Sequence, residues 1–206
     1  MLFRSVTIKE LTGSGNTEHV AETGTDATLT DWSRDGRTLF YSALNGLNQD
    51  VFALPLDGDR KPVSFLSGPY NEYDARLSPD GRFLAYTSTE SGREEIYVQP
   101  YPDRSDKWQV STRGGNDPVW GADGKQLYYL SSDNQMMSVP VRLAPTFAPG
   151  TPEALFDSRV FSPGGQKAHY CVTRDGGTFI LLRTLASRAL PTMTVVLNWQ
   201  AGLETR

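Results

Sequence analysis

Cysteine and histidine are scarce in this chain of 206 residues, and their scarcity argues against two kinds of site. Cys171 is the single cysteine, so the chain cannot form an internal disulfide. The two histidines, His19 and His169, do not have the spacing of zinc ligands, and Cys171 does not complete such a set. We therefore expect no metal site and no cofactor.

Positive charge is not concentrated anywhere, and long apolar runs are absent. The formal net charge is −4, without a basic cluster. Because duplex nucleic acid is bound by a concentrated positive surface, this composition argues against a nucleic-acid partner. No run of about 18 apolar residues occurs, so we expect no direct insertion into a membrane. The lone cysteine leaves the compartment open.

Catalytic signatures are missing as well. The sequence has no Gly-x-Ser-x-Gly elbow, which would hold a serine nucleophile. It also lacks a Gly-x-Gly-x-x-Gly motif between a strand and a helix, which would hold a nucleotide. The sequence therefore predicts that the chain is not an enzyme.

A repeated Asp-Gly turn is the most informative feature that is present. The aspartates lie 45, 43 and 52 residues apart, close to the 40–45-residue period of a four-stranded propeller blade. Asp-Gly between apolar runs predicts a hairpin, because Gly accepts positive φ and Asp bonds its own backbone. We assign these aspartates to turn capping rather than catalysis. The four turns are Asp35-Gly36, Asp80-Gly81, Asp123-Gly124 and Asp175-Gly176.

Apolar residues recur at fixed distances from each turn. Positions three and five residues after each Gly share one face of a strand, because strand side chains alternate. A third strand follows and ends in Pro at 50–55, 95–100 and 135–140, and a fourth lies at 62–66, 107–111 and 153–157. Since Pro cannot donate to a ladder, it marks where each third strand leaves its sheet. The recurring residues are Trp32, Leu39 and Tyr41; Leu77, Leu84 and Tyr86; Trp120, Leu127 and Tyr129; and Val172, Phe179 and Leu181.

The repeat predicts an all-β chain, a propeller of four-stranded antiparallel blades. We expect one propeller segment over 1–206, about four and a half blades long, that is part of a larger propeller. Its open blade edges would favour self-association. A compact ring of four blades, with 17–22 as the outer strand of the last blade, is the alternative. The predicted divisions are the outer half of a blade at 5–22, full blades at 26–70, 71–114 and 115–160, and a last blade at 166–203.

Polar and aromatic residues precede the inner strands of three units. Inner strands line the central channel of a propeller, so their lead-ins are expected to gather at one mouth. We predict that this rim binds a protein, a peptide or a small ligand. The rim residues are Tyr70, Asn71, Glu72, Tyr73, Asp74, Asn116, Asp117, His169 and Tyr170.

Residues 76–86, Arg-Leu-Ser-Pro-Asp-Gly-Arg-Phe-Leu-Ala-Tyr, resemble the repeat of TolB-like propellers, the bacterial relatives of WD-repeat proteins. Residues 191–199 resemble the close of propellers attached to membrane-bound bacterial serine/threonine kinases. This second resemblance implies an extracytoplasmic, periplasmic sensor whose kinase domain would precede residue 1. No kinase motif occurs in the chain itself.

Three functions follow from these observations. The first is a non-catalytic binding or sensor module within a larger bacterial signalling protein. The alternative is the gating propeller of a prolyl oligopeptidase-type serine peptidase, whose hydrolase domain would lie outside this chain. Direct catalysis by this chain would need a carboxylate pair or a metal at the channel.

Overall fold

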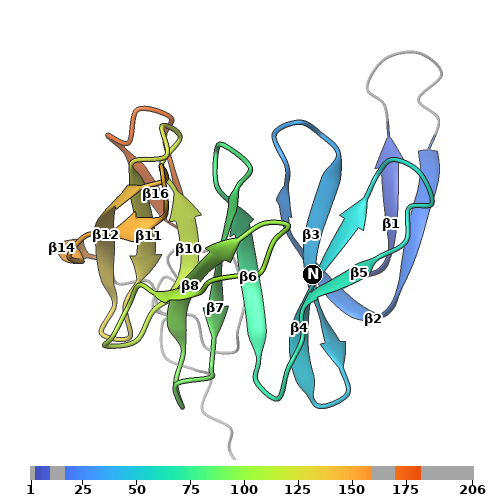
Figure 1. The fold of residues 1–206 in the computed structure, drawn as a ribbon, viewed down its shortest axis with the longest axis horizontal. Helices are drawn as coiled ribbons and strands as arrows, with labels where there is room; N and C mark the ends of the chain where they lie inside the picture. Colours follow the sequence, from blue (N-terminus) through green and yellow to red (C-terminus); the bar gives the residue numbers. More distant parts are fainter. Residues whose placement is uncertain (1–2, 10–16, 159–169, 182–206) are drawn as a thin grey trace, which may run out of the picture.

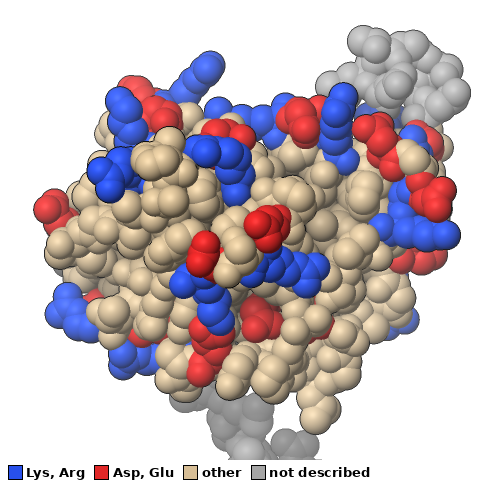
Figure 2. Space-filling view, in the orientation of Figure 1, with Lys and Arg blue, Asp and Glu red and all other residues tan. Residues whose placement is uncertain are grey.

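The computed structural model describes residues 3–9, 17–158 and 170–181, and all of its helix or strand elements are β-strands. They form four antiparallel sheets that succeed one another along the chain (Figure 1). The prediction of an all-β chain is therefore confirmed. No described residue belongs to a helix that could cross a membrane. On the face seen in Figure 2, Lys and Arg are interspersed with Asp and Glu.

The first two sheets contain nine strands between them. In each sheet, strands adjacent in the sequence are paired. The first sheet has β1 (Phe3–Lys9), β2 (Thr17–Trp32), β3 (Thr38–Asn45), β4 (Asn48–Pro55) and β5 (Val63–Leu66). The second has β6 (Glu72–Leu77), β7 (Phe83–Ser88), β8 (Glu95–Pro100) and β9 (Trp108–Gln109).

The third sheet follows the same order, with one additional short strand. It has β10 (Asn116–Trp120), β11 (Gln126–Leu130), β12 (Gln135–Arg142), β13 (Ala148–Pro149) and β14 (Glu153–Asp157), and both β13 and β14 pair with β12. The fourth sheet is described for β15 (Tyr170–Val172) and β16 (Phe179–Leu181). The strand expected at 193–199, and the rest of the predicted last blade beyond 181, lie outside the described residues.

Alternation along the second strand of each sheet divides the hydrophobic core among neighbouring sheets. On β7, Leu84 joins a cluster with Phe40 of the first sheet, whereas Ala85 joins a cluster with Leu127 of the third. The second sheet therefore buries both of its faces against its neighbours, as a propeller blade does. We call the face toward the preceding sheet the back face and the opposite one the forward face. The turn-related Leu and Tyr positions all lie on back faces.

The β1–β2 hairpin covers part of the back face of the first sheet. Val6 and Ala21 pack in one cluster with Leu39, Tyr41 and Leu54. The sequence reading separated 5–22 from 26–70, but β2 runs unbroken across that boundary, and β1 belongs to the same sheet. The strand continues because Gly24 takes a positive φ of 73° within it, which allows a change of direction without a loop.

A second correction concerns the proline at the end of the third strands. β4 and β8 end at Pro55 and Pro100, but β12 continues past Pro140 to Arg142. The ladder continues because Pro140 takes part in it only as a hydrogen-bond acceptor. Its carbonyl accepts the N–H of Gly150 at 2.7 Å. The next residue, Val141, donates its N–H to the Lys125 carbonyl at 2.8 Å.

The Asp-Gly turns share one hydrogen-bond pattern. In the second sheet, Asp80 Oδ1 accepts the Ser78 hydroxyl at 2.7 Å and the Arg82 N–H at 3.2 Å. Gly81 follows with φ of 76° and donates its N–H to the Ser78 carbonyl. The turns at Asp35 and Asp175 repeat this arrangement, and in the turn at Asp123 a glycine replaces the hydroxyl residue.

Gly81→Ala tests the positive φ of these turns. We expect a loss of about 1 kcal/mol of unfolding free energy, because no atom lies within 4 Å of an added Cβ and only the left-handed backbone opposes it. The control is Gly177→Ala, whose position has no positive φ. Urea denaturation should show an unchanged midpoint for the control. Equal losses in both variants would contradict the argument.

Candidate functional site

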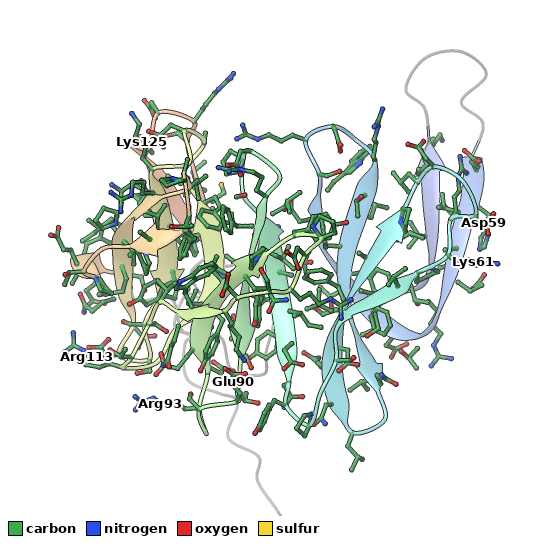
Figure 3. All side chains as sticks on the ribbon, in the orientation of Figure 1. Asp59, Lys61, Glu90, Arg93, Arg113 and Lys125 are labelled. Atoms are coloured by element: carbon green, nitrogen blue, oxygen red, sulfur yellow. The ribbon has the colours of Figure 1, made fainter. Side chains whose placement is uncertain are left out.

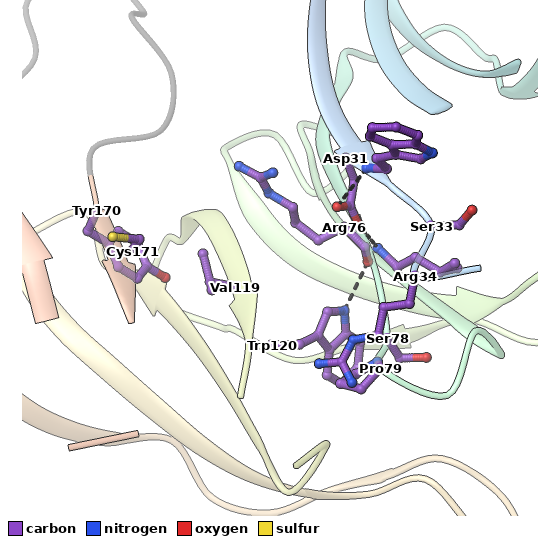
Figure 4. A pocket seen from close by; sticks show the side chains of 12 residues that line it. Asp31, Ser33, Arg34, Arg76, Ser78, Pro79, Val119, Trp120, Tyr170 and Cys171 are labelled. Carbon is purple, nitrogen blue, oxygen red and sulfur yellow. Dashed lines mark hydrogen bonds between the residues drawn. The ribbon is translucent and has the colours of Figure 1, made fainter. Parts of the chain in front are cut away.

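A pocket of about 280 Å³ opens where the inner strands β2, β6, β10 and β15 approach their Asp-Gly turns (Figure 4). Four of its lining residues occupy one repeat position, four residues before each turn aspartate: Asp31, Arg76, Val119 and Cys171. Figure 3 shows that this end lies opposite the β7–β8 loop, with Lys125 at one end of the blades and Glu90 at the other. The pocket is therefore lined by four successive units.

Asp31 is held at the wall of the pocket by backbone donors. Its Oδ2 accepts the N–H of Leu77 at 2.7 Å, and its Oδ1 accepts the N–H of Trp32 at 2.9 Å. Burial raises the pKa of Asp31, while the Leu77 N–H and the charge of Arg76 oppose that shift. Asp31 therefore links β2 to β6, and both of its carboxylate oxygens already accept hydrogen bonds from backbone N–H groups.

Two arginines give the pocket its positive charge. Arg76 donates from Nη1 to the Thr30 carbonyl, and its buried Nε has no hydrogen-bond partner among the described residues. Figure 4 shows Arg76 extending toward the side of the pocket where Tyr170 and Cys171 lie. Arg34 donates from Nη2 to the carbonyl of Ala122 at 3.1 Å, in the turn of the third sheet. The Nε of Arg76 is therefore a donor that no described residue satisfies.

Two tryptophans at equivalent repeat positions line the pocket, and one is buried while the other is exposed. Trp120 is 8% exposed and donates its indole N–H to the Arg76 carbonyl at 2.9 Å. Trp32 is 55% exposed. The pocket thus combines cationic groups with an accessible aromatic surface.

The lining side chains do not form a nucleophile paired with a base. Ser33 and Ser78 donate their hydroxyls to Asp35 and Asp80 in the turns. The exposed Cys171 is the one thiol of the chain. Within the described ranges, no group of three His, Cys, Asp or Glu residues could hold a metal ion. These side chains can bind a ligand, but they do not form a recognisable arrangement for general acid–base catalysis.

The predicted rim lies mainly at the other end of the inner strands. Glu72, Asp74 and Asp117 are buried, and the two aspartates take left-handed φ of 54° and 55° at bulges of β6 and β10. Tyr73 and Asn116 both donate to Glu94, which brings the second and third units together.

The remaining rim residues are dispersed. Tyr70 is exposed, and Asn71 Oδ1 accepts the N–H of Gln49 at 2.9 Å. Tyr170 is buried in the wall of the pocket and donates its hydroxyl to the Asp117 carbonyl at 3.0 Å. His169 lies outside the described residues. A binding role for the rim stays a prediction.

Sequence reasoning missed Asp31, Trp32, Arg34 and Arg76 as pocket residues. The repeat could have indicated this part of the pocket, because the position four residues before each turn aspartate recurs on every inner strand. Its occupants differ in chemistry, Asp, Arg, Val and Cys, so no shared residue type marked the position.

Comparisons with known proteins support the propeller architecture. No family profile matches the chain. Tricorn protease homolog 1 of Streptomyces coelicolor is 38% identical over 86 residues, which is 38% of this chain and 7% of that protein. TolB from Acinetobacter baumannii has a TM-score of 0.54 at 19% identity, over 84% of this chain and 46% of that one. A puromycin-hydrolyzing peptidase of Mycobacterium tuberculosis has a TM-score of 0.60 at 18% identity, over 85% and 34%.

The similarity to these structures concerns the fold. The chain spans less than half the length of each of these three proteins. Successive antiparallel sheets that share hydrophobic clusters with their neighbours, together with the likeness to TolB, confirm the predicted fold class. The chain therefore has the fold of a β-propeller, which it shares with TolB.

Proposed function

We propose that this chain is a non-catalytic binding module whose channel-mouth pocket receives a carboxylate group of a protein or peptide partner. The observation that carries the proposal is that two guanidinium groups, those of Arg34 and Arg76, line the pocket together with the exposed ring of Trp32. The Nε of Arg76 has no partner among the described residues. Guanidinium groups bind carboxylates through strong, directional hydrogen bonds.

The size and charge of the pocket narrow the ligand. A volume of about 280 Å³ lies at the small end of ligand pockets, so it suits one or two side chains or a chain terminus rather than a folded segment. Asp31 adds negative charge to the wall and would repel a dianion such as phosphate more strongly than a singly charged carboxylate. A peptide carboxylate is therefore the favoured ligand group.

Calorimetric titration with short peptides, each made with a free C-terminal carboxylate and as its amide, tests this proposal. We expect the free acids to bind and the amides to bind at least about tenfold more weakly, because one charge-assisted hydrogen-bond pair is lost. Arg76→Gln should reproduce the loss, while Lys61→Gln, at an exposed site in the loop before β5, should not. Equal affinity of wild type and Arg76→Gln for the acids would refute the pocket assignment.

The likeness to a peptidase favours a second candidate, a propeller that gates a hydrolase domain. In that arrangement the same pocket would meet substrate peptides on their way to a serine nucleophile outside this chain. Labelling the complete polypeptide with a fluorophosphonate probe would decide between the two. A labelled serine supports the gating function, and no labelling supports the binding module.

A more specific proposal is that the module is the sensor of a larger bacterial signalling protein. It rests on the resemblance of residues 191–199 to kinase-associated propellers, and it places the module outside the cytoplasmic membrane of a bacterium. Under that proposal, binding at the pocket would be the signal that the longer protein detects. A complete reading frame with a kinase domain and a membrane span ahead of the propeller would support it.

A further inference from the structure

The back face of the first sheet is only partly covered. Trp32 pairs with Leu39, and Leu29 with Tyr41, so all four side chains lie on that face. The β1–β2 hairpin buries Leu39 and Tyr41, but Leu29 is 47% exposed and Trp32 is 55% exposed. The inner half of this face is therefore an apolar surface that none of the four described sheets covers.

The chain itself shows what covers such a surface. Trp120 occupies the same repeat position in the third sheet and is buried against the forward face of the second. There it packs in one cluster with Phe83 and Ala85, and its indole N–H donates to the Arg76 carbonyl. The natural complement of Trp32 is thus the forward face of another blade, with an inner-strand carbonyl at the Arg76 position.

The last described sheet presents that forward face. Ile180 occupies the repeat position of Ala85 and is 60% exposed, whereas Ala85 is fully buried by the following sheet. Cys171 occupies the position of Arg76 and is exposed. One chain therefore carries both halves of a blade-to-blade contact, on the first and last of its described sheets, and the side chains of Trp32 and Ile180 are exposed there.

We propose that two copies of this chain associate head to tail through these faces. Trp32 of one copy packs on Ile180 of the other and donates its indole N–H to the Cys171 carbonyl there, as Trp120 does to Arg76. Within one chain Trp32 and Cys171 border the same pocket, yet Trp32 stays exposed, so the intrachain arrangement does not provide this contact. Because the two surfaces differ, the interface is heterologous and either closes a ring or extends.

Sedimentation velocity of the full chain over a range of concentrations tests the proposal. We expect a reversible larger species that Trp32→Glu and Ile180→Glu each abolish, since either change places a charge in the contact. Both side chains are more than half exposed, so both variants should retain the melting temperature of the wild type. Trp32→Ala removes the apolar contact without adding charge and gives the same readout if the charged variant does not fold. Leu47→Glu, at an exposed hairpin tip away from both faces, is the matched control and should still associate.

Mixing the two charged variants separates head-to-tail association from other forms. Trp32→Glu retains an intact forward face and Ile180→Glu an intact back face, so the mixture should form a dimer that neither variant forms alone. A symmetric interface would not be restored in this way. A wild-type chain that sediments as a monomer throughout, association that persists in either charged variant, or a mixture that stays monomeric would each overturn the proposal.

Discussion

Trp120→Ala is expected to lower the unfolding free energy by about 3–5 kcal/mol, the range for removing a large buried aromatic side chain. The indole packs in the cluster between the second and third sheets and contacts Phe147 edge-on, with ring centroids 6.2 Å apart. Its N–H is also the donor to the Arg76 carbonyl, which would lose that partner. Because this cluster joins two blades, the loss should appear in the cooperative unfolding of the whole unit.

The matched control is Trp32→Ala, at the same repeat position two sheets earlier. Since Trp32 is more than half exposed, its truncation should cost less than about 1 kcal/mol in the monomer. Urea denaturation at concentrations where the chain is monomeric measures both values. Comparable losses for the two variants would mean that repeat position, and not the covering blade, determines the contribution of the tryptophan.

The repeat made the arrangement of strands predictable because its signal is local. An Asp-Gly turn with alternating apolar residues on either side indicates a hairpin, and all of these residues lie within about a dozen positions of each other in the sequence. Strand β8, for example, coincides with the predicted segment 95–100. The burial of Leu84 on one face and Ala85 on the other follows from the same alternation.

Features that depend on neighbouring sheets were less predictable. The continuity of β2 depends on one left-handed glycine, Gly24, within a strand, and a Gly in a polar stretch reads equally well as a loop. The rim was placed at the polar lead-ins, but the side chains of Glu72 and Asp117 are buried rather than exposed at a mouth. Polarity in sequence does not distinguish a buried carboxylate from a solvated one, because burial is decided by residues of the adjacent blade.

Glu72→Gln is expected to remove a pH dependence of stability. Glu72 is 7% exposed, and its Oε2 has no hydrogen-bond partner among the described residues. Burial, with the charges of Asp50 and Glu90, raises its pKa from 4.5 to about 7, and Lys107 opposes the shift. The folded state therefore holds a proton that the unfolded chain releases. Between about pH 4.5 and 7 the stability contributed by this group falls as pH rises, and above 7 the ionised carboxylate costs about 2–3 kcal/mol.

The neutral amide of Glu72→Gln cannot ionise and can donate toward the neighbouring acidic side chains. The variant should therefore be more stable than the wild type by about 2 kcal/mol at pH 8, and nearly equal to it at pH 4. Urea denaturation across this pH range measures the difference, with Glu153→Gln on the exposed strand β14 as the control. A wild-type profile that parallels the Gln variant throughout would mean that Glu72 ionises as an exposed carboxylate does. In that case the junction between the first two sheets must admit water around its side chain, because only solvation would relieve the burial and the repulsion from Asp50.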